Sequence, residues 1–171
     1  MIYKFVVISS EEESFIREFE LDENNTLMDF HITLQEELEF DKSQIATFFT
    51  TTENWEKEEE FTLFDMGSNN TIMEEVLIAD ILINENQKLL YIFDLFNERA
   101  LFIECIGEVD LIVGREYPIC SQSKGLPPKQ VVVNDFNDID FSDDVLSDQG
   151  SMIDEESELP GFENLEDFDD L

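Results

Sequence analysis

Positive charge is scarce in this sequence. Nine Lys or Arg residues stand against 43 Asp or Glu residues, which gives a net charge of −34 at pH 7. Nucleic-acid binding through phosphates needs clustered bases, and anionic membrane surfaces attract the same clusters. The bases are instead scattered singly: Lys4, Arg17, Lys42, Lys57, Lys88, Arg99, Arg115, Lys124 and Lys129. The charge pattern therefore argues against direct binding to DNA, RNA or a membrane surface. It is compatible with a protein partner that has a basic surface, with a divalent cation or with a high-salt interior.

Histidine, glycine and cysteine are also rare. One His and six Gly argue against a histidine-rich metal site and a glycine-rich phosphate loop. The sequence has no Gly-x-Ser-x-Gly motif and no Cys–His pair with a supporting spacing, so we expect neither a metal nor a cofactor. Cys105 and Cys120 have no metal or redox spacing, which indicates reduced thiols, with one disulfide between them as the alternative.

Long apolar runs are missing too. No segment approaches the roughly 18 consecutive apolar residues that a membrane-spanning helix needs. The first residues, MIYKFVVISSEEE, lack the apolar region and cleavage site of a signal peptide. Together with the reduced cysteines, these observations predict a cytoplasmic protein.

What the chain does have is enough apolar material for one domain with a core and an appendage. Of its 171 residues, 42% are hydrophobic and sixteen are Phe. Residues 2–9 are rich in β-branched and aromatic side chains, and residues 14–21 alternate between apolar and polar side chains. Both patterns are typical of strands, so we expect the chain to open with an antiparallel β-hairpin.

The period then changes from two to that of a helix. Leu27, Phe30, His31, Leu34 and Leu38 recur at helical spacing, and Thr26 precedes them at a capping position. We therefore predict one main helix over about 27–38, packed on the hairpin. The class is α+β, with a mixed, mainly antiparallel sheet.

The later segments are shorter and alternate with turns. We expect strands at 45–52, 61–64 and 111–113, and a hairpin of two central strands at 88–96 and 99–106. Residues 55–60 read as a charged turn, 67–71 as a loop, and 76–83 as a strand that runs into one helical turn. Residues 114–130, which are rich in Gly and Pro, read as a loop that closes the domain.

Four segments carry recognisable patterns in a fixed order. They are Phe15-Ile16-Arg17-Glu18-Phe19, the helix segment 27–35, Tyr91-Ile-Phe93-Asp94-Leu95-Phe96-Asn97, and Cys120 with Gly125-Leu126-Pro127-Pro128-Lys129. In this order they resemble the plasmid pRiA4b ORF-3-like protein family over about residues 2–130. Members have an Ile-x-Arg strand, a Leu-x-x-Leu-His-x-x-Ile-Gln helix, a Tyr-x-Tyr-Asp-Phe-Gly-Asp-x-Trp-x-His hairpin and a Cys-x-x-Gly-x-x-x-x-Pro-Pro-Glu loop. The resemblance implies a compact α+β domain.

The chain departs from the family at polar positions. Phe96 stands where the hairpin has Gly, Asn97 where it has the second acid, and other residues replace its Trp and His. Phe40 and Gln44 similarly take the places of a Trp and a His after the helix. If those polar groups form a site in relatives, this chain has lost most of it. What would remain is a family-like site at His31, Asp94 and Glu104.

Each of these polar residues also has a purely structural interpretation. His31 lies on the apolar face of the helix, where a packed histidine is the alternative to a catalytic base. Asp94 lies in an apolar strand, where it either faces solvent or pairs, and Arg99 is within reach across the hairpin.

The last 38 residues, 134–171, contain 15 Asp or Glu and no Lys, Arg or His. They also contain many large apolar residues, which a solubilising spacer does not need. Four of these recur every three residues, Phe162, Leu165, Phe168 and Leu171, so a short helix would present them together. We call the first three, Phe162, Leu165 and Phe168, the tail anchors. The tail either packs on its own domain, docks in a partner's groove with a basic rim, or stays a disordered extension.

The sequence therefore predicts a domain over 1–130 and an acidic tail over 131–171. The function expected first is a non-catalytic protein-interaction module that uses the tail anchors. The second is a small-ligand binder or an enzyme with the family-like site. The third is a nucleic-acid mimic that occupies the groove of a basic protein.

Overall fold

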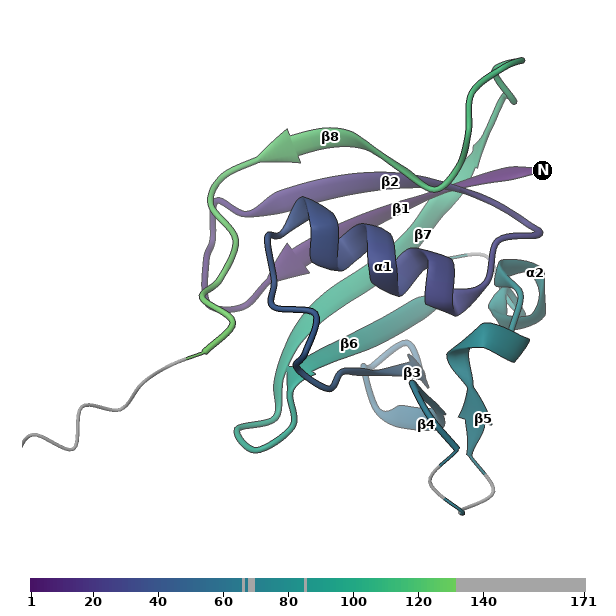
Figure 1. Cartoon of the computed structure of the whole chain (residues 1–171). Coiled ribbons are helices and arrows are strands. Elements are labelled where there is room, and N and C mark those ends of the chain that lie inside the picture. Colours follow the sequence, from purple (N-terminus) through teal and green to yellow (C-terminus); the bar gives the residue numbers. More distant parts are fainter. Residues whose placement is uncertain (66, 68–69, 85, 132–171) are drawn as a thin grey trace, which may run out of the picture. The chain divides into compact units, whose positions relative to one another are not determined.

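The first hairpin has the pairing that its alternating side chains predict. A computed structural model describes residues 1–65, 67, 70–84 and 86–131 of the chain (Figure 1). In it, β1 (Ile2–Ser9) pairs antiparallel with β2 (Ile16–Asp22), and Phe5 lies opposite Phe19. Both rings are fully buried, because odd-numbered residues of the two strands face the core.

Helix α1 (Leu27–Glu37) covers this hairpin, as predicted (Figure 1). Asp29 N donates to Thr26 Oγ1 at 3.1 Å, and Thr26 N donates to Asp29 Oδ2 at 2.8 Å, so a complete capping box starts the helix. Phe30 projects from the helix into the core, with its ring centroid 5.7 Å from that of Phe5 and 5.5 Å from that of Phe19. These aromatic contacts hold the helix on the sheet.

The sheet has eight strands in the order β5-β4-β3-β6-β7-β1-β2-β8. The remaining strands are β3 (Thr47–Thr51), β4 (Lys57–Thr62), β5 (Thr71–Ile72), β6 (Lys88–Asp94), β7 (Arg99–Val109) and β8 (Ile119–Lys124). All neighbours are antiparallel except β4 and β5, which confirms the predicted mixed, mainly antiparallel α+β fold. The predicted hairpin of central strands is β6–β7.

Two segments predicted as a turn and a loop are strands. Residues 57–60, read as a charged turn, belong to β4; the strand lies near the sheet edge, where its acidic side chains reach water. Residues 119–124, read as part of the closing loop, form β8 between Pro118 and Gly125. The Gly and Pro residues that indicated a loop flank this short strand rather than interrupt it.

Three smaller predictions are also wrong. Residues 76–83 contain the predicted helical turn, α2 (Ile78–Ile81), but residues 76–77 before it are not the predicted strand; the 3-10 helix η1 (Met73–Glu75) ends just before them. Residues 71–72 were expected in a loop and form β5. Residues 111–113, although apolar, are exposed and lie in no strand.

The core fills one face of the sheet, beneath α1 and α2. No helix within the described ranges is both long and apolar enough to span a bilayer. The tail predicted at 131–171, including the tail anchors, lies outside the described residues from position 132 onward.

Candidate functional site

His31, the single histidine, is a buried partner of Tyr91. Its side chain is 4% exposed, and a hydrogen bond of 2.9 Å joins its Nδ1 to the Tyr91 hydroxyl, which projects from β6. Burial lowers the pKa of His31 from 6.5 to about 4, so the imidazole is neutral near pH 7. Burial also raises the pKa of Tyr91. Both side chains are buried, and this pair serves packing between helix and sheet.

Asp94 closes the β6–β7 hairpin. Its Oδ1 accepts from the backbone N–H of Phe96 at 3.2 Å and of Asn97 at 3.1 Å, and its Oδ2 accepts from Asn97 Nδ2 at 2.8 Å. Arg99 Nη1 lies 3.6 Å from Oδ2, so the predicted cross-hairpin ion pair exists. The bond from Asn97, followed by the backbone donors and Arg99, lowers the pKa of Asp94. Asp94 is therefore ionised, and its hydrogen bonds stabilise the turn of the hairpin.

Glu104 lies far from both of these residues. It alternates with the core-facing Ile103 and Cys105 on β7, so it projects from the opposite face of the sheet to His31. Its strand neighbours are Val6 and Lys88, whereas Asp94 pairs with Arg99. Five residues of β7 separate these pairs, which is about 17 Å at about 3.4 Å per residue. The structure thus places the three residues of the family-like site at three separate locations.

Arg99 forms hydrogen bonds to two segments that are distant in sequence from its own hairpin. Its Nε and Nη2 donate to the carboxylate of Glu11 at 2.8 and 2.6 Å, and its Nη1 donates to the carbonyl of Gln130 at 3.0 Å. Gln130 in turn bonds the backbone of Asp41 through both ends of its side-chain amide. Residues 41–45, the hairpin tip and residues 129–131 therefore sit side by side.

An apolar groove lies between these three segments. It has a volume of about 460 Å³ and is lined by Ser43, Gln44, Ile45, Phe93, Asp94, Leu95, Phe96, Asn97, Gln130 and Val131. Phe96 at the hairpin tip is 100% exposed, and Ile45, Leu95 and Val131 are each about half exposed. We refer to this feature as the tip groove. Of the family-like site, it includes only Asp94.

Sequence reasoning did not identify the tip groove. Its segments come from three distant parts of the chain, so no local pattern connects them. One signal was present: Leu95 and Phe96 place two large apolar side chains in a hairpin turn, where small or polar residues are usual. At position 96, this chain also has Phe where the family that it resembles has Gly.

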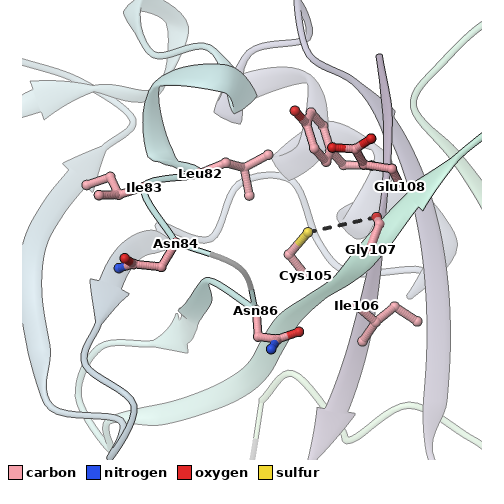
Figure 2. Close-up of a pocket in the computed structure, with 9 residues that line it drawn as sticks. Leu82, Ile83, Asn84, Asn86, Cys105, Ile106, Gly107 and Glu108 are labelled. Atoms are coloured by element: carbon pink, nitrogen blue, oxygen red, sulfur yellow. Dashed lines mark hydrogen bonds between the residues drawn. The ribbon is translucent and has the colours of Figure 1, made fainter.

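A second cavity lies between the segment after α2 and the end of β7 (Figure 2). Its volume is about 590 Å³, and its lining is Tyr3, Leu82, Ile83, Asn84, Asn86, Cys105, Ile106, Gly107 and Glu108. Cys105 Sγ lies 4.0 Å from the Gly107 carbonyl, a contact drawn in Figure 2. Burial raises the pKa of the Cys105 thiol, so it stays protonated near pH 7 and is a weak nucleophile.

The described residues form neither a metal site nor a disulfide. Across the described part of the chain, no three His, Cys, Asp or Glu side chains gather as a metal site would need. Cys105 and Cys120 are free thiols. Burial, and to a lesser extent the nearby Glu37 carboxylate, raises the pKa of Cys120 to about 11.

Arg17 fastens β8 to the hairpin that opens the chain. Its side chain is 5% exposed; Nη1 donates to the carbonyl of Lys124 at 2.7 Å, and Nη2 donates to that of Gly125 at 3.2 Å. Nε lies 3.0 Å from Glu37 Oε1, an ion pair without a well-directed hydrogen bond. Arg17 and Gly125 belong to two different segments of the family pattern, and the fold brings them into contact.

Comparison with known proteins found a matching family and a similar fold. A family model described as plasmid pRiA4b ORF-3-like protein matches residues 2–139. Among solved structures, the chain is similar to the crystal structure of a protein of unknown function, MM3350, from Methanosarcina mazei Go1. The TM-score is 0.58 at 18% identity, over 71% of this chain and 68% of that one, a likeness that concerns the fold alone. No curated protein sequence matches the chain significantly.

Proposed function

The chain belongs to the plasmid pRiA4b ORF-3-like family, and within this family we propose that it is a non-catalytic protein-interaction module. The observation that carries the proposal is the tip groove. A fully exposed Phe96 beside half-exposed Leu95, Ile45 and Val131 is a contiguous apolar surface, and such surfaces mark protein interaction sites. Aromatic side chains of this kind are common anchors of binding energy.

The ionisable groups near the groove support binding rather than catalysis. Asp94 is committed to four contacts inside the hairpin, and Arg99 to Glu11, Asp94 and two backbone carbonyls. These contacts lower the pKa of Asp94 and raise that of Arg99, away from the range in which proton transfer is efficient near pH 7. They instead hold the hairpin tip in a fixed shape, which reduces the entropy cost of binding.

The charge of the domain indicates the chemistry of the partner. Fifteen of the 43 acids lie in the tail, which leaves 28 acids against nine bases in residues 1–133. We assign to the partner a basic surface and an apolar group that enters the tip groove. The tail anchors, in residues 131–171, would form a second contact in which the surrounding acids steer the encounter. The two free cysteines support a reducing compartment, the cytoplasm.

A binding experiment with matched variants tests the proposal. Immobilised full-length protein, its Leu95→Ser/Phe96→Ser variant and its Ile83→Ser variant are compared for the proteins that they retain from cell extract. Ile83 is 75% exposed but lines the second cavity, so it controls for the loss of an exposed apolar side chain. A partner lost only with the hairpin variant is expected; identical retention by all three proteins would contradict the tip groove as a binding surface.

The tail contribution is measured separately. A Phe162→Ala/Leu165→Ala/Phe168→Ala variant keeps all acids of the tail while it removes the anchors. Retention of the same partner is expected to weaken in this variant and in high salt. If the variant retains the partner as well as the parent does, the tail anchors do not contribute to binding, and the proposal rests on the tip groove alone.

A further inference from the structure

Strand β8 is an open edge of the sheet. It stands last in the strand order and pairs only with β2. Among the described residues, no loop or turn forms a backbone hydrogen bond to it. In an antiparallel pair, alternate residues direct their backbone N–H and C=O away from the partner strand, so β8 presents backbone donors and acceptors at this edge. Side chains already occupy two of its carbonyls, those of Gln122 and Lys124, which accept from Cys120 and Arg17. Figure 1 shows β8 at the margin of the sheet beyond β2.

This edge has two of the features that hinder strand addition, the single charged residue Lys124 and a register shift opposite Glu18 and Phe19, but in the described structure it is neither covered nor interrupted by proline. Residues 121–124 are exposed. The opposite edge, β5, is two residues long and is therefore too short to accept a strand. Strand addition in this sheet is thus directed to β8.

The charge around β8 differs from that of the rest of the domain. The stretch from Tyr117 to Asn134 is the longest in the chain without Asp or Glu. It holds two exposed lysines, Lys124 at the end of β8 and Lys129 in the following segment. On the neighbouring strand β2, Glu18 and Glu20 lie opposite Gln122 and Ile119, but ion pairs with Lys4 and Arg115 neutralise them, so an acidic ligand at this edge is attracted by the two lysines.

Among the described residues, these two lysines are also the basic side chains without partners. Ion pairs hold six of the others: Lys4–Glu18, Arg17–Glu37, Lys42–Glu36, Lys57–Glu98, Arg99–Glu11 and Arg115–Glu20. Lys88 donates to the carbonyl of Glu53 at 2.9 Å. Within the described ranges, Lys124 and Lys129 have neither an ion pair nor a side-chain hydrogen bond. They remain available for a ligand.

The edge is also held in place before any ligand arrives. Arg17 clamps the carbonyls of Lys124 and Gly125, as described above. Gly125 has a φ of +72°, and a Cβ there would lie 2.3 Å from the carbonyl oxygen of Ser14, so only glycine fits this close approach. A strand fixed at its end loses little entropy when another strand pairs with it.

We propose that the outer edge of β8 binds an acidic segment of another protein as an added β-strand, with its carboxylates beside Lys124 and Lys129. Backbone hydrogen bonds along 119–124 supply the register, and the two lysines select acidic side chains. The inference does not rest on the tip groove, because it uses the backbone of β8, which does not line that groove, and a partner of opposite charge.

The test uses the full-length protein and a labelled ten-residue peptide in which Glu alternates with Val. A second peptide, with every other Val replaced by Pro, keeps the charge but cannot form a ladder. Fluorescence anisotropy is expected to show binding of the first peptide, and at least tenfold weaker binding of the second. Equal binding of the two peptides would overturn the strand-addition mechanism.

Matched charge variants test the role of the lysines. Lys124→Gln/Lys129→Gln and Lys42→Gln/Lys57→Gln each remove two positive charges, but the second pair lies in existing ion pairs elsewhere. We expect the first variant to weaken the Glu–Val peptide about five- to tenfold, and the second to change it less than twofold. Equal effects would reduce the interaction to overall charge and overturn the assigned site.

Amide hydrogen exchange identifies the occupant. Outward-facing amides of 119–124 are expected to exchange quickly in the isolated full-length protein and to become protected when the Glu–Val peptide is added. Protection in the isolated protein that does not depend on concentration would assign the edge to the chain's own residues. Protection that grows with concentration would assign it to a second copy. Either result would overturn binding of an external acidic strand.

Discussion

His31 and Tyr91 are joined by a buried hydrogen bond of 2.9 Å that connects α1 to the middle of the sheet. The two rings also pack at a centroid distance of 5.7 Å. The pair lies beneath the helix, and neither residue lines either cavity. In this chain, the histidine that the family pattern has in this helix therefore has a structural role. Burial of His31 also makes stability depend on pH.

The free energy of unfolding should fall as the pH drops from 6.5 to 4. The folded-state pKa of His31 is lowered to about 4 from 6.5, so in this window the unfolded chain binds a proton that the folded chain does not. The loss attributable to His31 is about 3 kcal/mol, complete below pH 4. Urea unfolding of the parent and of His31→Gln across pH 4–7.5 measures it, since Gln can form hydrogen bonds but does not titrate. Parallel pH profiles of the two proteins would contradict this account.

Removal of the Tyr91 hydroxyl should destabilise the domain. Tyr91→Phe leaves His31 Nδ1 buried without its partner, at a cost of about 1–3 kcal/mol. Tyr117→Phe is the control, because its hydroxyl accepts a bond from an exposed backbone N–H at 3.3 Å. Urea unfolding at pH 7.5 should separate the two variants. If both variants lose the same free energy of unfolding, the buried hydrogen bond does not stabilise the domain more than the exposed one.

Arg17 should matter more than any other arginine for stability. Arg17→Gln leaves two carbonyls and the Glu37 carboxylate without their cation, so we expect a loss of about 2–4 kcal/mol. Arg115→Gln breaks a pair in which the Arg115 side chain is 40% exposed and that of Glu20 12%, and it should cost less than Arg17→Gln. Hydrogen exchange at 123–125 should accelerate in the Arg17 variant. The account fails here if those amides stay as protected as in the parent.

Substitution of Phe96 at the hairpin tip should affect binding but not stability. Phe96→Ser changes a side chain that is 100% exposed, so the free energy of unfolding should move by no more than about 0.5 kcal/mol. Phe93→Ala, three residues away and 3% exposed, should cost about 3–5 kcal/mol. Thermal and urea unfolding of both variants test this contrast. A large loss from Phe96→Ser would make the residue part of the core rather than a binding surface.

Much of the fold follows from periodic side chains. The hairpin alternates with period two from Phe15 to Leu21, and the helix that follows repeats its apolar residues at helical spacing behind the Thr26 cap. Core burial then selects one face of each element, so the local pattern and the tertiary structure agree. The pairing of Asp94 with Arg99 was likewise predictable, because a tight hairpin brings its ends together.

The elements that sequence missed lack that periodic signal. Strand β8 is polar and mostly exposed, so its identity depends on the backbone of β2 rather than on its own side chains. The acidic β4 is stabilised in the same way, by pairing with β3. The tip groove needs Ile45, Leu95 and Val131 in one place, and the long-range bonds of Arg99 and Gln130 that create it have no sequence signature.

The most direct test of the interaction module is amide hydrogen exchange of the full-length protein, alone and in cell extract, read at residues 95–98 and 134–171. The account predicts fast exchange at the hairpin tip in isolation, and protection there in extract that the Leu95→Ser/Phe96→Ser variant abolishes. Protection of the tail in extract would add the tail anchors to the interface. Exchange at the hairpin tip that is the same in extract as in isolation would contradict the tip groove as the binding surface.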